Sequence, residues 1–369
     1  MDFELSTRSI THTVDSSHQG PVEEDYEQVD PSLLPGLPND IALQCLARVP
    51  RRCHPRLAMV CKRWKEMLLS REYYFLRKEM SLTEGWIYSL IRDSSEILHW
   101  FVMDPMERKW RELPKMPGDC AKRYGVTSEV LDKQLFVLGG LKKYQSPTSE
   151  VVKYDPVTNQ WIEVANMETA RCYFVCAAFD GQLYAVGGMG THTGVPSSWE
   201  VYDSATKRWS SFEDQNIVQD LGEYLVFDRK LYIRHICPSN QPSDTAVFDP
   251  AQNSWAPVYN EMTKNWVGPT ASAGDDMYML DQTYGVKLMV LDKGTFTWKS
   301  LGRLAPISVQ PPCGLAVVRR NLYLVGKGLR TTVIDMDRAD DSGGFLVTSS
   351  FTGPINPDNM ALSCHVIEM

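Results

Sequence analysis

Histidine and cysteine are among the residues of this 369-residue chain that could bind a metal or take part in catalysis; there are seven histidines and nine cysteines. No two cysteines form a Cys-x-x-Cys pair, and Cys53-His54 has no second Cys/His pair after it at metal-finger spacing. The chain also has no glycine-rich phosphate-binding loop and no nucleophile elbow. The sequence therefore predicts no metal site, no cofactor and no catalytic residues.

The cysteines are odd in number and scattered, which is typical of reduced thiols in a cytoplasmic or nuclear protein. The N-terminus has no basic start followed by an apolar run, so we expect no signal peptide. The longest apolar stretch, residues 174–179, is far shorter than the roughly 20 residues that span a bilayer. We expect a protein of the cytoplasm, the nucleus or both, with no membrane partner.

Basic and aromatic side chains in three long segments could instead bind a partner. The segments are residues 141–150, 189–199 and 234–244. Two arginines that precede strand-like segments add to these side chains. Together they form a candidate binding set: Lys142, Lys143, Tyr144, His192, Trp199, His235, Arg123 and Arg171. Whether these residues meet in space depends on the elements that carry them.

Those elements follow a repeat in which an aspartate is followed six residues later by a tryptophan. The spacing occurs five times, and successive tryptophans lie 51, 48, 46 and 43 residues apart. The pairs are Asp104/Trp110, Asp155/Trp161, Asp203/Trp209, Asp249/Trp255 and Asp292/Trp298. A period of this length built from short strands predicts a β-propeller.

Each residue of the repeat has a structural role. The aspartate precedes proline at three of the five positions and can cap backbone N–H groups of a type I turn. The tryptophan begins an outer strand and can fill the space between neighbouring blades. Two repeats also carry paired glycines, Gly139-Gly140 and Gly187-Gly188, which permit close backbone approach or positive φ where a second strand ends.

The strand count predicts six blades. The first repeat supplies three strands, from residue 86 onward, and lacks an inner strand. The last supplies four, at 314–318, 322–325, 332–335 and 345–349, and a further strand at 361–367 remains. We expect this last strand to complete the first blade, because closing the ring removes open sheet edges.

Two different segments precede the repeats. Residues 1–31 hold eight acids and one base and show no apolar period, which predicts a disordered acidic tail. Residues 32–80 hold ten bases and four acids, and residues 81–369 carry the remaining net charge of −7. The basic segment has no interleaved stacking aromatics, so we expect an acidic protein partner and no nucleic acid.

Residues 32–80 have the apolar spacing of short amphipathic helices. One helix ends at Val49-Pro50, and a second stripe runs at i, i+3, i+4, i+7 and i+11 from Leu57. The chain is thus mainly β: a six-bladed β-propeller at 81–369 closed by its C-terminal strand, a small α-helical domain at 32–80 and a tail at 1–31.

The helical segment resembles an F-box and the repeats resemble kelch repeats. The F-box match rests on Leu37, Pro38, Ile41, Leu46, Val49, Pro50, Val60, Cys61, Arg63, Trp64 and Leu68. All of these except Arg63, together with Leu57, are the predicted adaptor-binding residues. The kelch match rests on the double glycines, Tyr154-Asp155, Trp161, Tyr202-Asp203 and Trp209. Together they resemble the plant F-box/kelch-repeat proteins, although only the second and third repeats have the full pattern.

The resemblance implies a substrate receptor of an SCF (Skp–cullin–F-box) ubiquitin ligase. The apolar F-box residues would dock on the acidic Skp adaptor and, through it, on cullin, and the propeller would hold a target protein. We expect this subunit to contribute proximity and no covalent chemistry.

In a propeller the loops between second and third strands lie on the same face as the loops between blades. The candidate binding set falls in these loops, so we expect it to form the target-binding face, with Arg123 and Arg171 near the centre. The alternative is that these are solvated loop residues and that each arginine forms a salt bridge with a neighbouring blade.

Two other functions are open to a kelch propeller. One is a scaffold that acts outside the ligase. The other is an enzyme, but no histidine here has an aspartate four residues before it, as the plant kelch-type iron-dependent proteins require.

Overall fold

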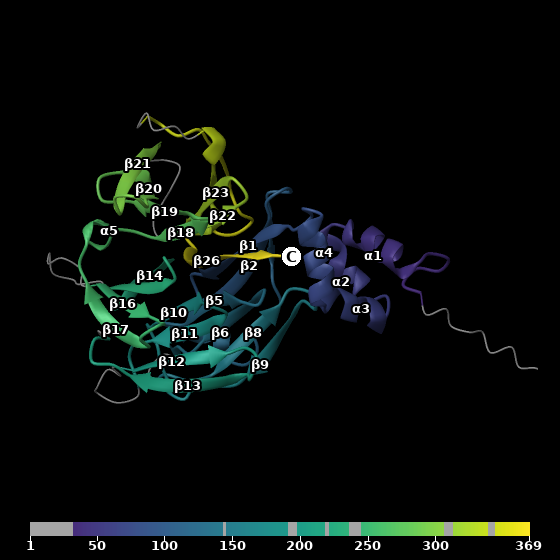
Figure 1. The fold of residues 1–369 in the computed structure, drawn as a ribbon, viewed down its shortest axis with the longest axis horizontal. Coiled ribbons are helices and arrows are strands. Elements are labelled where there is room, and N and C mark those ends of the chain that lie inside the picture. The colour runs from purple at the N-terminus through teal and green to yellow at the C-terminus, as the bar shows by residue number, and fades with distance from the viewer. Residues whose placement is uncertain are drawn as a thin grey trace, which may run out of the picture.

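A computed structural model describes residues 32–142, 145–190, 198–217, 221–235, 245–305, 313–338 and 344–369. It has a small helical domain at one end and a larger all-β body (Figure 1). The predicted acidic tail, residues 1–31, lies outside the described residues. None of the described helices is long and apolar enough to cross a membrane.

The helical domain is held together by capped helices around a small apolar core. Its elements are α1 (Asn39–Ala47), a 3-10 turn (Arg51–Cys53), α2 (His54–Leu57), α3 (Lys62–Leu69) and α4 (Arg71–Glu79). The Cys61 Sγ and Ser70 Oγ atoms accept hydrogen bonds from the backbone N–H groups of Trp64 and Tyr73, which caps α3 and α4. Leu46, Leu68 and Tyr73 are buried.

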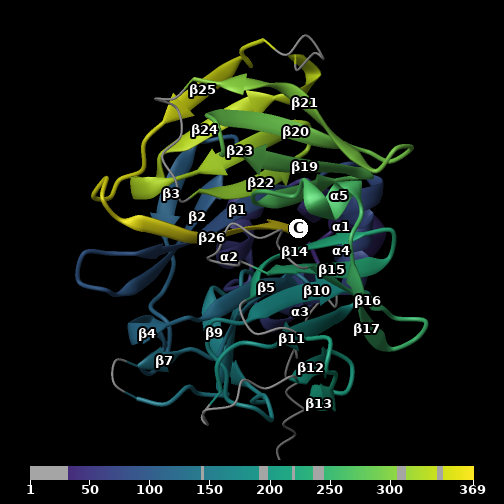
Figure 2. The same ribbon diagram turned by 90° about the vertical axis from the view of Figure 1, so that its left-hand side faces the viewer.

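The β body consists, among the described residues, of six four-stranded antiparallel sheets around a common axis (Figure 2). The strands of each blade are given from the innermost outward. Blade 1 is β26 (Met360–Glu368), β1 (Gly85–Arg92), β2 (Leu98–Asp104) and β3 (Lys109–Glu112); blade 2 is β5 (Thr127–Leu131), β6 (Gln134–Leu138), β8 (Val151–Asp155) and β9 (Gln160–Val164); blade 3 is β10 (Val175–Phe179), β11 (Gln182–Val186), β12 (Ser198–Asp203) and β13 (Arg208–Glu213). Blade 4 is β14 (Leu221–Phe227), β15 (Lys230–His235), β16 (Thr245–Asp249) and β17 (Ser254–Val258); blade 5 is β18 (Thr270–Ala273), β19 (Asp276–Asp281), β20 (Val286–Asp292) and β21 (Thr297–Leu304); blade 6 is β22 (Gly314–Val318), β23 (Asn321–Val325), β24 (Thr331–Asp335) and β25 (Thr348–Phe351).

Short elements lie in the loops. They are a two-stranded ladder of β4 (Arg123–Tyr124) and β7 (Leu141–Lys142), the helix α5 (Glu261–Lys264), and 3-10 turns at Cys120–Lys122, Lys327–Leu329 and Met336–Arg338.

The C-terminal strand closes the ring. β26 pairs antiparallel with β1 from Gly85↔Glu368 to Arg92↔Met360 and is the innermost strand of blade 1. The prediction of six blades with this closure is confirmed. One outer strand differs: β25 is Thr348–Phe351 instead of residues 345–349, because Phe345 pairs with Arg303 of blade 5 in an isolated bridge.

The repeat aspartates act as the sequence predicts. In all five turns one carboxylate oxygen accepts a hydrogen bond from the backbone N–H two residues later, at 2.7–2.9 Å. The double glycines also have their predicted role, since Gly139 and Gly140 have φ of 61° and 88° and a Cβ on Gly139 would lie 2.4 Å from the Arg171 carbonyl oxygen.

Three of the repeat tryptophans fasten a blade to the segment that enters it. Trp161, Trp209 and Trp298 donate their indole N–H groups to the carbonyl oxygens of Pro114, Ala165 and Met262, respectively, each at 2.8–2.9 Å. Trp209 is buried, whereas Trp161 is half-buried.

The other two repeat tryptophans, Trp110 and Trp255, differ from these three. Trp110 in β3 is 6% exposed and donates its indole N–H across the closure to Thr331 Oγ1 of blade 6, at 3.1 Å. Trp255 in β17 is 2% exposed, and its Nε1 atom has no hydrogen-bond partner in the part of the chain that the structure describes. Its ring lies edge to face with Trp199 of blade 3, with centroids 6.2 Å apart. Trp110 and Trp255 are therefore buried core residues between neighbouring blades, which is the role that the repeat predicts for its tryptophans.

The Trp209→Ala variant tests whether a repeat tryptophan fastens its blade to the segment that enters it. We expect its free energy of unfolding to fall by about 3–5 kcal/mol, because a buried aromatic side chain is truncated and the Ala165 carbonyl loses its donor. Urea denaturation measures the loss. Phe212→Ala, in the same strand but 36% exposed, is the control and should cost much less. Equal losses in the two variants would contradict the assignment.

Candidate binding surfaces

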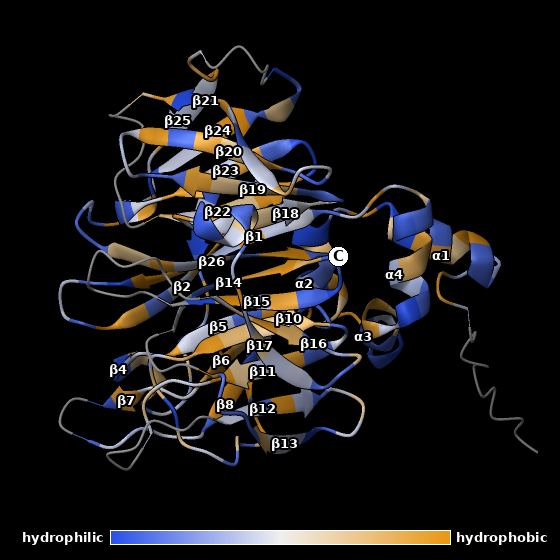
Figure 3. Cartoon of the chain, turned by 60° about the vertical axis from the view of Figure 1, so that its left-hand side comes forward, coloured by the Kyte–Doolittle hydropathy of each residue, from blue (hydrophilic) through white to orange (hydrophobic). Residues whose placement is uncertain are grey.

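The helical domain covers one face of the propeller. Arg52 forms an ion pair with Glu107 in the β2–β3 turn (Nε–Oε1 3.8 Å), and the Lys133 ammonium in the β5–β6 turn lies 3.1 Å from the centre of the Tyr74 ring. The loops between second and third strands and between blades therefore lie on the opposite face. Figures 1 and 3 place α5 and the β4–β7 ladder on that side, far from α1 and α3. We call it the free face.

One apolar cluster joins the two domains. Leu46, Leu68 and Tyr73 of the helices belong to the same buried cluster as Tyr154 and Ile367 of blades 2 and 1. Burial of a common core favours a single orientation of the helical domain on the propeller.

Arg51 binds the propeller at the centre of this junction. Its side chain is 3% exposed and donates to the carbonyl oxygens of Ile367 and Glu84 and to the Tyr88 hydroxyl, while its guanidinium lies 4.8 Å from the centre of the Trp86 ring. Burial lowers the pKa of Arg51.

Arg77 holds the other side of the junction. It is 1% exposed and donates to the carbonyl oxygens of Ala47 (2.6 Å), Val49 (2.9 Å) and Leu82 (2.6 Å) and to Glu84 Oε1 (3.1 Å). The same Glu84 oxygen accepts the backbone N–H of Arg51. One carboxylate thus connects both arginines to the segment that leads into β1.

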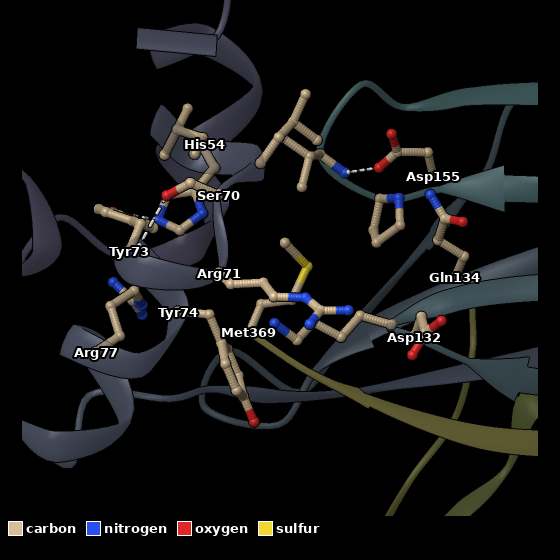
Figure 4. Close-up of a pocket in the computed structure, with 15 residues that line it drawn as sticks. His54, Ser70, Arg71, Tyr73, Tyr74, Arg77, Asp132, Gln134, Asp155 and Met369 are labelled. Atoms are coloured by element: carbon tan, nitrogen blue, oxygen red, sulfur yellow. Dashed lines mark hydrogen bonds between the residues drawn. The ribbon is translucent and has the colours of Figure 1, made fainter. Parts of the chain in front are cut away.

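A cavity of about 250 Å³ lies beside this junction, between α3–α4 and the turns of blade 2 (Figure 4). Arg71 and Tyr74 lie on its helical side and Asp132 and Gln134 on its propeller side. His54 lies at its edge within 3.3 Å of the Tyr73 hydroxyl, and burial lowers the pKa of His54 to about 4. The neutral His54 ring belongs to the packing of the domain.

The predicted adaptor-binding residues divide into outer and inner groups. Leu37, Ile41 and Val60 are 39%, 42% and 61% exposed, and Pro38 and Cys61 are also exposed. The sequence pattern does not mark Met59 as an adaptor-binding residue, although Met59 adjoins Val60 and is 80% exposed.

The inner group holds the helical domain together. Leu46 and Leu68 are buried and Val49, Pro50, Leu57 and Trp64 are half-buried; Trp64 also donates its indole N–H to the Leu33 carbonyl at 2.9 Å. An adaptor could contact the outer group directly. Leu46 and Leu68 are buried and could affect adaptor binding only by stabilising the fold of the helical domain.

The prediction that Arg171 contacts a target directly is wrong. Its side chain has 0% exposure, donates to Glu200 Oε1 (3.0 Å) and Ser198 Oγ (2.8 Å), and also donates to the Gly187 and Ser198 carbonyl oxygens. Burial lowers the pKa of Arg171. The arginine fastens the ends of β11 and β12 to the inter-blade loop. A salt bridge is the expected alternative, but its partner Glu200 belongs to blade 3, which Arg171 enters, and not to a neighbouring blade.

Arg123 has the same role in blade 2. It is 5% exposed, pairs with Glu150 and lies next to Lys142, which pairs with Asp119. Glu150 directly precedes β8 and Glu200 lies within β12, the third strands of their blades, 27 and 29 residues after their arginines. This recurring Arg–Glu spacing is the signal that could have predicted the pairing.

Trp199 is also a core residue and not a surface contact. It is 2% exposed and stacks on Phe212 with ring centroids 4.6 Å apart. Lys143, Tyr144 and His192 lie outside the described residues, as does the side chain of His235, whose backbone ends β15. Their assignment to the target face stays a prediction.

The sequence did not reveal the central channel. A cavity of about 1220 Å³ runs between the innermost strands of all six blades and opens on the free face, where these strands begin. Inside it, the His365 ring lies 2.9 Å from Ser128 Oγ and 3.6 Å from Glu129, which accepts a hydrogen bond from the Tyr224 hydroxyl. Burial lowers the pKa of His365 to about 4 and raises that of Glu129 to about 7.

Comparisons with known proteins agree with these two parts. Residues 34–76 match the F-box domain model, and residues 89–286 match the KLHDC2/KLHL20/DRC7 Kelch-repeats domain model. The chain is 35% identical over 338 residues to the F-box/kelch-repeat protein SKIP4 of Arabidopsis thaliana, covering 90% of this chain and 93% of the relative. It is 29% identical to F-box/kelch-repeat protein At1g30090 of the same plant, covering 82% and 78%.

A solved structure titled "Structure of YjhT" shares the fold, with a TM-score of 0.53 at 15% identity, covering 72% of this chain and 94% of that one. The sequence relatives span both the helical domain and the propeller. The chain therefore belongs to the F-box/kelch-repeat protein family.

Proposed function

We propose that this protein is the substrate-recognition subunit of an SCF-type ubiquitin ligase of the cytoplasm or nucleus. The observation that carries the proposal is an F-box with exposed apolar residues, fixed by buried arginines to one face of a propeller, while the described helices leave the opposite face uncovered. The F-box docks on a Skp adaptor and, through it, on cullin, and the propeller binds a target protein for ubiquitination.

The chemistry of each surface supports this division. Leu37, Ile41, Met59 and Val60 form the exposed apolar group, and the surrounding segment, residues 32–80, has ten bases and four acids. Apolar contacts would supply affinity, and the positive charge would favour an acidic adaptor. The subunit contributes proximity: the junction holds a bound target at a fixed distance from the enzyme that carries ubiquitin.

Adaptor docking is tested by Ile41→Glu and Val60→Glu. We expect either variant to weaken binding to a Skp adaptor at least tenfold, because a carboxylate replaces an apolar contact and repels an acidic partner. Isothermal titration calorimetry measures the dissociation constant.

Ile162→Glu is the matched control, since Ile162 is 44% exposed on β9 of the propeller and should leave adaptor binding unchanged. If the wild-type chain does not bind an adaptor, the ligase proposal fails. Adaptor binding without cullin recruitment would favour a scaffold that acts outside the ligase.

A further inference from the structure

The mouth of the central channel has apolar walls. Val126, Phe174, Val267 and Leu362 line it where the inner strands begin on the free face, and Val267 and Leu362 are each 42% exposed. Tyr173, beside Phe174 in the chain, is 52% exposed. We call Val126, Phe174, Val267 and Leu362 the channel mouth.

The described lining of this channel offers no cation. None of the described residues that line it is lysine or arginine. The nearby arginines of blades 2, 3 and 4 are paired with Glu150, Glu200 and Glu223 respectively. A carboxylate that entered the mouth would lose its hydration and find no positive partner among these residues.

A cation would also lack a free partner in the described lining. The lining carboxylate, Glu223, already accepts from Arg234 at 2.8 Å, and Arg234 is held in place by the Trp266 carbonyl at 2.9 Å. Glu223 is half-buried, and desolvation raises its pKa, which further disfavours its use as a bare anion.

Five inner polar residues of the channel form hydrogen bonds with one another. Ser128 Oγ lies 2.9 Å from both Ser363 Oγ and the His365 ring, and Glu129 pairs with Tyr224. These hydrogen bonds join blades 1, 2 and 4, so the groups do not depend on a ligand for partners.

We infer that the channel mouth binds an uncharged, apolar segment of the target protein. The inference rests on the proposed function in one respect: the segment that occupies the channel mouth is taken to belong to the target protein. An apolar side chain gains by leaving water for the walls formed by Phe174, Val267 and Leu362, whereas an acidic or basic side chain is desolvated without compensation. The mouth thus selects against charge.

Three libraries of displayed 12-residue peptides test this inference on the full chain. One library is restricted to uncharged residues, one carries four acidic residues and one carries four basic residues. We expect enrichment from the uncharged library. Fluorescence anisotropy of an enriched peptide should show at least tenfold weaker binding to Val267→Glu and to Leu362→Glu.

Ile162→Glu, outside the channel, should bind the peptide as the wild type does. Thermal melting confirms that each variant is folded, and Val267→Glu is decisive if the change at Leu362 affects the closing strand. Enrichment of acidic or basic peptides, no binders from any library, or binding unaffected by both mouth variants would overturn the inference. Adaptor binding measured on the same proteins separates its failure from a failure of the ligase proposal.

Discussion

Deletion of residues 360–369 is expected to abolish cooperative folding of the propeller. The deleted segment contains all of β26, which is the innermost strand of blade 1 and pairs with β1 from end to end. Its loss exposes the edge of β1 and removes Ala361 from the apolar cluster between blades 1 and 6 and Ile367 from the cluster that joins the F-box to blades 1 and 2. It also removes the carbonyl that accepts from Arg51. Calorimetry should show no propeller transition.

Point variants in β26 distinguish the loss of ring closure from an effect of shortening the chain. Ile367 is 1% exposed and Leu362 is 42% exposed. Ile367→Asp should lower the free energy of unfolding by more than about 4 kcal/mol, because it buries an unpaired charge. Leu362→Asp should cost much less. A truncated chain that melts like the wild type would contradict the role of β26 in closure.

Local chemistry explains why the blade pattern could be predicted from the sequence. The capping of a turn by Asp155 and the indole hydrogen bond of Trp161 use residues at fixed spacing, so each blade repeats the same signal. Closure followed from one strand that had no partner in its own repeat. The misplaced strand of blade 6 lacks an Asp–Trp pair, and its boundary shifted by three residues at its start.

The same spacing does not predict what each tryptophan contacts. Trp110 bonds to Thr331, which lies 221 residues later and comes from the blade on the other side of the closure. Trp255 packs on Trp199, a residue outside the repeat positions. The spacing therefore marks where a tryptophan sits in its blade, whereas the neighbouring blade decides whether the indole N–H finds an acceptor.

The binding surfaces were harder to predict because their contacts join distant segments. Ser128 meets His365 across 237 residues, and Glu129 meets Tyr224 across 95, so no short pattern indicates the channel network. An amphipathic stripe also does not show whether one helix carries all of its residues. The stripe from Leu57 is broken by a turn at residues 58–60 between α2 and α3, so Val60 in that turn is 61% exposed, whereas Leu68 in α3 is buried.

The arginines show the same limit. A basic residue near a loop predicts a surface contact unless its partner is known, and the partners of Arg123 and Arg171 follow 27 and 29 residues later. Charge reversal at Arg171 would leave Glu200 buried beside a second carboxylate. That variant would therefore test the stability of blade 3 and not the binding of a target.

Arg77→Met is expected to separate the F-box from the propeller. The change leaves the carbonyl oxygens of Ala47, Val49 and Leu82 without their donor and removes the ion pair with Glu84. Buried acceptors left without a donor cost about 1–3 kcal/mol each, and three carbonyl oxygens lose theirs. Arg77→Lys should not restore stability fully, because one ammonium cannot reproduce the fork geometry of a guanidinium. Calorimetry of the full chain should resolve an early F-box transition that the wild type lacks.

Lys78→Met is the matched control, because Lys78 is the next residue of α4 and is exposed. It should leave both melting and ubiquitin transfer unchanged. If the proposed function is right, Arg77→Met should slow ubiquitin transfer to a bound target at a temperature where the F-box still binds its adaptor, because the target is then no longer held at a fixed distance. Unchanged melting of Arg77→Met would show that the apolar cluster alone fixes the junction. Transfer at the wild-type rate in a variant with a separated F-box transition would show that the ligase does not need this rigidity.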